Sequence, residues 1–269
     1  MTRIARVFSQ NKKVFVAYIT AGDPTPERTP ALVAALERGG AGLIELGVPF
    51  SDPVADGPVI MRAGDRALRA GTTVAKVLDI ARDIRRSSEI PLLLFTYLNP
   101  VIRYGLDRLA ADAKAAGIDG CLLTDASVEE AGAYVETMRA AGLDTVFLAA
   151  PTSTPQRLQL VAQYSSGFVY LVSRTGVTGV QSSVSGSVKP LVESVRKVTK
   201  LPLAVGFGVS SPAHVAELFE VADGVVVGSA FMRLIEENAA SPQLEQRLED
   251  FTRNLLSQSS ARRAEGQTT

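Results

Sequence analysis

The stretch Gly42-Leu43-Ile44-Glu45-Leu46-Gly47-Val48 is an apolar run that contains a single acidic residue. With the two-residue period of a β-strand, Ile44, Leu46 and Val48 share one face, and Glu45 falls on the other. The bulky aliphatic face is suited to packing against helices, so we expect Glu45 to point to the opposite side. A strand that is apolar almost throughout is typical of a parallel sheet covered by helices.

Further runs of this kind lie along the whole chain, separated by helical patterns. The predicted strands cover residues 14–20, 42–47, 91–96, 120–124, 144–149, 167–173, 203–206 and 224–227. Examples of the predicted helices are residues 25–39, 74–87, 127–141 and 155–164. Eight strands, each followed by a helix, predict an α/β fold of the (β/α)8 TIM-barrel type. We also expect an extra N-terminal helix and extended loops after the second and sixth strands.

A doubly wound parallel sheet is the competing architecture. Such a sheet usually has fewer strands and carries a glycine-rich dinucleotide-binding turn after the first one. The first turn here is Ala21-Gly22-Asp23-Pro24, which does not have that pattern. We therefore expect a single barrel domain over residues 1–257 and a frayed C-terminal tail over residues 258–269.

The composition of the chain restricts its function. The 269 residues are 46% hydrophobic, and 28 Lys and Arg balance 28 Asp and Glu, so no net positive charge attracts nucleic acid or anionic lipid. The single cysteine, Cys121, excludes an intramolecular disulfide, and the single histidine, His214, leaves no His/Cys cluster for a metal. Without a signal-peptide or membrane-spanning run, we expect a cytoplasmic protein whose acid–base chemistry rests on carboxylates.

Three carboxylates lie at or just after the second predicted strand. Inside the barrel, near its upper rim, burial would raise the pKa of Glu45 toward the range of a general acid or base. The alternative is a buried Glu paired with a basic residue, but no other predicted strand places Lys or Arg on the inward side. The following loop, residues 49–58, presents Asp52 and Asp56, although Asp-Pro and Asp-Gly also occur in ordinary turns.

Glycine-rich turns follow the last two predicted strands, at Gly206-Phe207-Gly208 and Gly228-Ser229. In many barrels these two loops bind phosphate through backbone N–H groups and a helix N-terminus. Alternatively, Ser229 caps a helix and the glycines serve only as turns. The loop after the sixth strand, residues 174–183, is small and polar, which suits either a lid or a disordered surface loop.

Residues 45–58, ELGVPFSDPVADGP, resemble the signature of the tryptophan synthase alpha subunit family. Residues 20–24, 173–179, 206–208 and 228–229 match in order, so the resemblance spans nearly the whole chain. It implies a (β/α)8 lyase of tryptophan biosynthesis that cleaves indole-3-glycerol phosphate to indole and glyceraldehyde 3-phosphate, with no metal or cofactor in this chain. It also implies an α2β2 complex with a beta subunit that holds pyridoxal phosphate and receives indole through a tunnel.

The resemblance also implies roles for individual residues. Glu45 is then the general acid/base at the indole carbon that bears the side chain, and Asp56 holds the indole N–H and stabilises the developing positive charge. The residues implied for the indole pocket are Tyr18, Phe95, Tyr97, Leu122, Thr124 and Tyr170, with Thr178 as the lid residue that closes onto Asp56. Those implied for the phosphate site are Gly179, Phe207, Gly208, Gly228 and Ser229. Those implied for the partner interface are Asp52 and Pro53.

Two other functions stay open. One is a catalytically weak subunit whose main role is to activate the beta partner, and the intact Glu45 and Asp56 argue against it. The other is a different phosphate-binding barrel, such as an isomerase acting on phosphoribosyl anthranilate, which lacks the support of residues 45–58. A turnover assay of the isolated chain distinguishes the first alternative from an active lyase.

Overall fold

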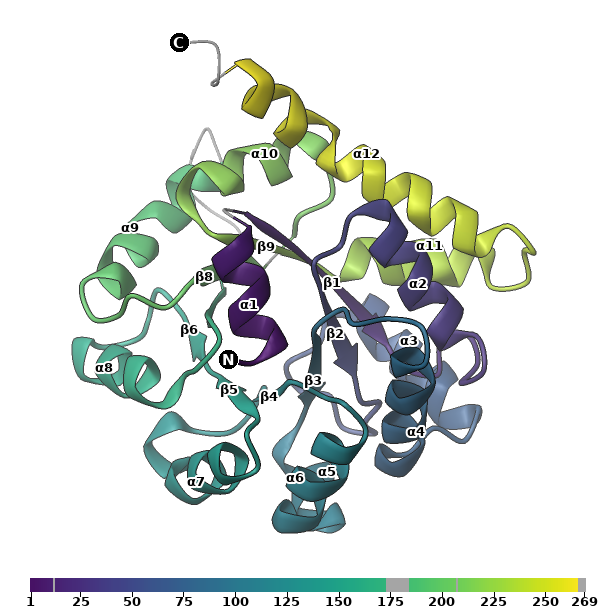
Figure 1. Ribbon diagram of the computed structural model, residues 1–269, viewed down its shortest axis with the longest axis horizontal. Coiled ribbons are helices and arrows are strands. Elements are labelled where there is room, and N and C mark those ends of the chain that lie inside the picture. The colour runs from purple at the N-terminus through teal and green to yellow at the C-terminus, as the bar shows by residue number, and fades with distance from the viewer. Residues whose placement is uncertain (12, 173–183, 207, 266–269) are drawn as a thin grey trace.

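Parallel strands form one curved sheet that closes into a barrel (Figure 1). The structure is a computed structural model, and it describes residues 1–11, 13–172, 184–206 and 208–265. The strands are β1 (Val14–Thr20), β2 (Leu43–Gly47), β3 (Leu92–Thr96), β4 (Gly120–Leu123), β5 (Asp144–Val146), β6 (Leu148–Ala149), β7 (Val169–Val172), β8 (Leu203–Gly206) and β9 (Gly224–Val227). Their order in the sheet is β5-β4-β3-β2-β1-β9-β8-β7-β6, which confirms the expected barrel.

The fifth predicted strand, residues 144–149, is divided in two. β5 pairs with β4, whereas β6 pairs with β7 on the other side. Between them, the carbonyl of Phe147 accepts a hydrogen bond from the backbone N–H of Tyr170 (3.1 Å). One short segment thus connects the two ends of the sheet. The eight expected strands appear as nine because each half of the fifth pairs with a different neighbouring strand.

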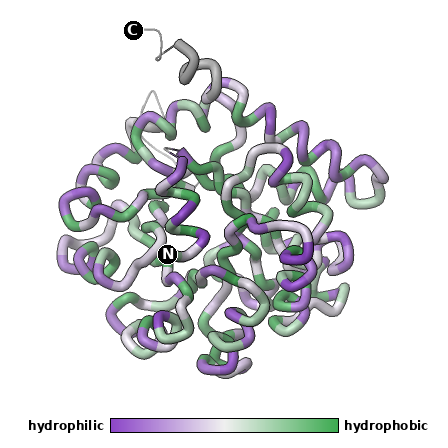
Figure 2. The backbone as a smooth tube through the Cα atoms, in the orientation of Figure 1, coloured by the Kyte–Doolittle hydropathy of each residue, from purple (hydrophilic) through white to green (hydrophobic). Residues whose placement is uncertain are grey.

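The sheet separates an inner apolar layer from an outer one. In β2, Ile44, Leu46 and the following Val48 belong to the outer layer between sheet and helices, while Leu43 belongs to the inner layer. This confirms the two faces expected from the sequence. Figure 2 shows hydrophobic residues concentrated on the strands and hydrophilic residues frequent along the outer helices. Removal of this apolar surface from water is the main favourable contribution to folding.

Helices surround the barrel (Figure 1). They are α2 (Thr29–Gly39), α4 (Val74–Arg85), α6 (Leu106–Ala115), α7 (Gly132–Ala140), α8 (Pro155–Tyr164), α9 (Val184–Arg196), α10 (Pro212–Val221) and α11 (Ser229–Asn238). Two of the predicted helices differ from the observed ones by more than two residues or in their continuity. α2 begins at residue 29 rather than 25, with Pro30 in its first turn, where proline is tolerated. The helix predicted over residues 127–141 is divided into a short 3-10 turn, η1 (Val128–Glu130), and α7.

The extended loop predicted after the second strand contains a helix of its own. Helix α3 (Pro58–Arg69) lies between β2 and α4 and begins with a proline, whose fixed φ suits the first helical position. A second additional helix, α5 (Leu98–Tyr104), follows β3. The other extended loop, after the sixth predicted strand, falls largely on residues 173–183, which lie outside the described residues.

One helix at each end of the chain packs against the barrel. The expected N-terminal helix, α1 (Arg3–Gln10), buries Ile4 in the inner layer, and Figure 1 shows it across the near end of the barrel. Helix α12 (Leu244–Glu265) packs against α2 and α10. The domain boundary expected at residue 257 falls inside α12, whose backbone is helical to Glu265. Across the described ranges, no helix has both the length and the apolar character of a membrane span.

Candidate active site

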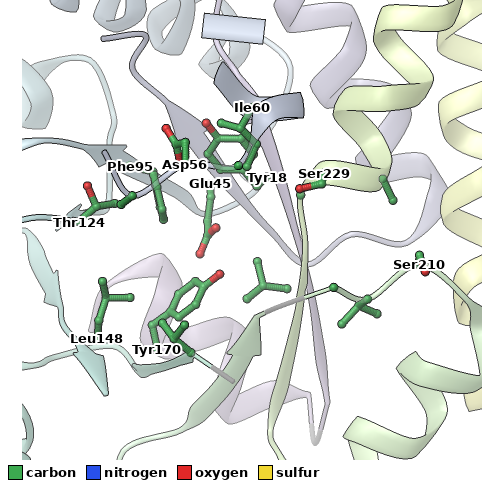
Figure 3. A pocket seen from close by; sticks show the side chains of 18 of the residues that line it. Tyr18, Glu45, Asp56, Ile60, Phe95, Thr124, Leu148, Tyr170, Ser210 and Ser229 are labelled. Carbon is green, nitrogen blue, oxygen red and sulfur yellow. The ribbon is translucent and has the colours of Figure 1, made fainter. Parts of the chain in front are cut away.

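A cavity of about 540 Å³ lies at the carboxyl ends of the strands, where TIM-barrel enzymes carry their active sites. It extends from the carboxylates of Glu45 and Asp56 to the loops that follow β8 and β9 (Figure 3). Its volume lies within the range of about 300–1,000 Å³ that is typical of small-molecule sites. One cavity therefore connects the carboxylates with the glycine-rich turns, which the sequence analysis had identified separately.

Glu45 reaches the cavity because of the register of the central strands. Its Cα pairs with that of Tyr18 on β1 and that of Leu93 on β3, and both neighbours belong to the inner side of the barrel. Glu45 is only 1% exposed, and its Oε1 has no hydrogen-bond partner among the described residues. Burial alone raises the pKa of this carboxyl to about 8. Glu45 is thus largely protonated at neutral pH and is able to donate a proton.

We predict that this buried carboxyl makes stability depend on pH. Because the folded protein raises the pKa of Glu45 from 4.5 to about 8, the folded state binds this proton more tightly than the unfolded state. The contribution of the group to the free energy of unfolding is therefore complete below pH 4.5 and falls as the pH rises to about 8.

Chemical denaturation of the wild type and of Glu45→Gln across this pH range measures the effect. The glutamine variant should lack this decline, so its stability relative to the wild type should increase with pH. Glu237→Gln, at an exposed position of α11, is the control and should follow the wild type. Parallel curves for Glu45→Gln and wild type would contradict the raised pKa.

Asp56 lies on the loop between β2 and α3, two residues before the helix begins. Its side chain is half-buried and lines the cavity. Burial raises the pKa of Asp56, and a hydrogen bond from the Tyr97 hydroxyl opposes this shift by stabilising the carboxylate. The same hydroxyl accepts a hydrogen bond from the backbone N–H of Ala55 (3.2 Å). Tyr97 thereby holds both the carboxylate and the loop that carries it.

Aromatic side chains form the walls between the two carboxylates. The rings of Tyr18 and Phe95 make an edge contact, with centroids 5.2 Å apart. The Tyr18 hydroxyl shares a hydrogen bond with Thr20 Oγ1 (3.2 Å). The position of the Tyr18 hydroxyl requires glycine at residue 47, because a Cβ at that residue would lie 2.4 Å from the Tyr18 oxygen. Figure 3 shows the Glu45 carboxylate between Tyr18 and Tyr170, and burial keeps the pKa of both phenols well above the ordinary value.

The far end of the cavity is formed by the N-terminus of α11. Gly228 and Ser229 both line the cavity, as does Gly208 after β8. Gly228 is the N-cap residue, and no described side chain caps the helix, so Ser229 is the first helical residue rather than its cap. The unpaired N–H groups and the positive end of the helix dipole at such a terminus favour an anion.

Comparisons with known proteins agree with this arrangement. The family model described as "Tryptophan synthase alpha chain" matches residues 4–260. A tryptophan synthase alpha chain from Solibacter usitatus is 70% identical over 259 residues, which covers 95% of this chain and 97% of that relative. The chain belongs to the tryptophan synthase alpha chain family. It is therefore a lyase of tryptophan biosynthesis, as the sequence resemblance implied.

Solved structures of the family show the same fold. The alpha subunit of tryptophan synthase from Legionella pneumophila has a TM-score of 0.90 at 36% identity, covering 97% of this chain and 99% of its own. A chain from Pyrococcus furiosus, from a structure described as that of the mutual activation of the tryptophan synthase α2β2 complex, has a TM-score of 0.85 at 39% identity. It covers 92% of this chain and 99% of its own.

The catalytic and ligand-binding residues assigned by resemblance to the alpha chain family fall into three groups. Those that line the cavity are Glu45, Asp56, Tyr18, Phe95, Thr124, Tyr170, Gly208, Gly228 and Ser229. Two others lie behind it: Tyr97 holds Asp56, and Leu122 packs in the inner apolar layer. The remaining three, Thr178, Gly179 and Phe207, lie outside the described residues, as does most of the predicted lid.

Other residues line the cavity without having been predicted. Val172 lies two residues after Tyr170 in β7, and Val226 lies two residues before Gly228, so strand periodicity could have found both. Arg233 lies four residues after Ser229 on α11, which is the spacing of one helix face. Leu148 carried no such signal, because its position depends on the division of the fifth strand.

The expected partner-interface residues lie beside the cavity, on the loop that carries Asp56. Asp52 is exposed and accepts a hydrogen bond from the Ser51 hydroxyl (2.6 Å), and Pro53 is half-buried. The next residue, Val54, is an aliphatic side chain that is 83% exposed. Asp52 and Val54 thus lie on the surface of the alpha chain.

Proposed function

We propose that this alpha chain cleaves indole-3-glycerol phosphate to indole and glyceraldehyde 3-phosphate by a retro-aldol reaction. The observation that carries the proposal is the buried carboxyl of Glu45, which has a pKa of about 8. Its Oε1 has no hydrogen-bond partner in the described part of the chain and faces an aromatic-walled cavity. An anion-binding helix terminus lies at the other end of the same cavity. A ligand with a flat apolar ring at one end and a phosphate at the other matches the aromatic-walled end and the anion-binding end of this cavity.

The reaction needs a proton at carbon, a partner for a cationic ring and removal of a proton from a hydroxyl. Protonated Glu45 supplies the first proton to the indole ring carbon that bears the side chain. The Asp56 carboxylate accepts the indole N–H and stabilises the positive charge that develops on the ring. The carbon–carbon bond then breaks, its electron pair restores the aromatic ring, and the adjacent hydroxyl becomes the aldehyde. The Glu45 carboxylate takes up the hydroxyl proton and returns to its initial state.

The partner in this proposal is a beta subunit in an α2β2 complex, to which the indole passes. Three exposed apolar side chains support docking at the rim of the cavity: Val54 after β2, and Leu98 and Ile102 on α5 after β3. Because β2 and β3 are neighbours, these side chains belong to adjacent loops at the same rim. The chain itself then needs no cofactor, pyridoxal phosphate belongs to the beta subunit, and the complex is cytoplasmic.

Release of indole from indole-3-glycerol phosphate tests the proposal. The isolated chain should release indole and glyceraldehyde 3-phosphate in equal amounts, and addition of the beta subunit should increase the rate. If neither preparation released indole, the proposed reaction would be wrong. If the chain activated the beta subunit but released no indole itself, its role would be that of an activator.

We predict that Gly228→Val weakens phosphate binding. A Cβ at residue 228 would lie 3.3 Å from the Cβ of Tyr18, so a branched side chain would fill the space through which a ligand approaches the backbone of α11. Hydrogen bonds to a charged group contribute about 1.5–3 kcal/mol each, so losing one weakens binding about 10-fold to 100-fold. Calorimetric titration with glycerol 3-phosphate measures the loss.

The control for this variant is Gly132→Val on α7, where the nearest atom to an added Cβ is 3.9 Å away. It should bind glycerol 3-phosphate as the wild type does. Unchanged affinity in Gly228→Val would place the phosphate elsewhere.

A further inference from the structure

The described charged residues that line the cavity are one basic and two acidic side chains. Among the described residues that line it, Arg233 is the sole cation, and Glu45 and Asp56 are the carboxyl groups. Arg233 lies on α11, four residues after Ser229. Residues at this spacing lie on the same face of a helix, and helical side chains lean toward the N-terminus. The Arg233 side chain is therefore directed back along α11 toward the helix terminus at the phosphate end.

Nearby acidic groups do not neutralise Arg233. Within the described ranges, no carboxylate oxygen lies within 4.0 Å of its guanidinium, whereas Arg62 and Arg66 of α3 are paired. Arg62 and Arg66 both contact Glu236, each at 2.7 Å, and Arg66 also binds Asp23 with two hydrogen bonds of 2.8 Å. Glu236, three residues after Arg233 on α11, is thus engaged by α3.

A phosphorylated ligand needs a compensating charge at this end of the cavity. The N-terminus of α11 contributes only about half a positive charge, whereas a phosphate monoester carries nearly two negative charges at neutral pH. The cavity is built to receive a ligand at its other end, because Glu45 is 1% exposed and has an unpartnered oxygen in the cavity. An arginine one turn from the helix terminus adds a full charge and donors that suit phosphate oxygens.

We propose that Arg233 binds the phosphate of the ligand together with the N-terminus of α11, and so makes the cavity specific for phosphorylated substrates. This inference rests on the proposed function for the identity of the substrate. Arg233 acts on binding: its guanidinium pairs with the phosphate at the mouth of the cavity, while Glu45 and Asp56 act on the ring at the other end.

Calorimetric titration of Arg233→Gln with glycerol 3-phosphate tests the proposal. Loss of a charge-assisted contact should weaken binding about 10-fold to 100-fold, and Arg233→Lys should recover part of the affinity. The affinity of the wild type should fall more steeply with added salt than that of Arg233→Gln, because the variant lacks the charge that salt screens. Arg62→Gln, which removes an arginine that does not line the cavity, is the matched control and should bind as the wild type does.

Steady-state kinetics with indole-3-glycerol phosphate provides a second readout. In Arg233→Gln the loss should appear mainly as an increase in KM, and circular dichroism should show an unchanged fold. Equal affinity of Arg233→Gln and wild type for glycerol 3-phosphate, or no binding by either, would overturn the assignment of Arg233. If Arg233→Gln bound glycerol 3-phosphate less tightly but the wild type released no indole, the assignment would stand and the proposed reaction would be wrong.

Discussion

Replacement of Glu45 by glutamine is expected to reduce indole release by about 10²- to 10⁴-fold, the usual contribution of a general acid or base. Glutamine preserves the size and the polar end of the side chain, but it cannot donate or accept the transferred proton. No other carboxyl group lines the cavity in the described part of the chain except Asp56, which lies on the loop after β2. The loss should therefore fall on kcat.

Two measurements separate loss of chemistry from loss of fold or binding. Glycerol 3-phosphate should bind to Glu45→Gln as it does to the wild type, because the phosphate end of the cavity is unchanged. In the wild type, kcat/KM should decline above about pH 8, where Glu45 loses the proton that it must donate. Near wild-type turnover in Glu45→Gln would remove Glu45 from the mechanism.

Asp56→Asn is expected to reduce kcat by about 10²-fold or more, as removal of one electrostatic contact to a developing charge commonly does. Asparagine still accepts a hydrogen bond, including the one from Tyr97, so the loop should keep its conformation. What the variant lacks is the negative charge opposite the cationic ring. The cost should therefore appear in the chemical step more than in substrate binding.

Steady-state kinetics of indole release measures this effect. Asp65→Asn, at an exposed position of α3, removes a charge from the helix that follows the same loop and should leave kcat unchanged. An Asp56→Asn variant with raised KM and wild-type kcat would make Asp56 a binding residue only. Together, the two carboxylate variants distinguish proton transfer from charge stabilisation.

The position of Glu45 could be predicted because it follows from a short-range pattern. Alternation along β2 placed Ile44, Leu46 and Val48 on one face, and the barrel has that face outward. Its position on the acidic loop that follows Glu45 made Asp56 a candidate, although an isolated Asp-Gly dipeptide is equally compatible with a turn, and family resemblance supplied its specific role. The contact that Tyr97 makes could not be predicted from a short-range pattern. Resemblance assigned the residue to the indole pocket, and in the structure its hydroxyl holds Asp56 from 41 positions along the chain.

The sequence alone therefore determined the (β/α)8 barrel, the inward carboxylate and the two glycine-rich turns, because strand alternation, helix periodicity and turn residues act over a few neighbouring positions. Tertiary structure decided the division of the fifth strand, which depends on pairing with β4 and β7 on opposite sides. It also decided which arginines form ion pairs. Glu236 binds Arg62 and Arg66 from another helix, and Arg233 has no carboxylate partner among the described residues. Ion pairing depends on distance in space, and elements far apart in the sequence are brought within that distance only when the barrel closes.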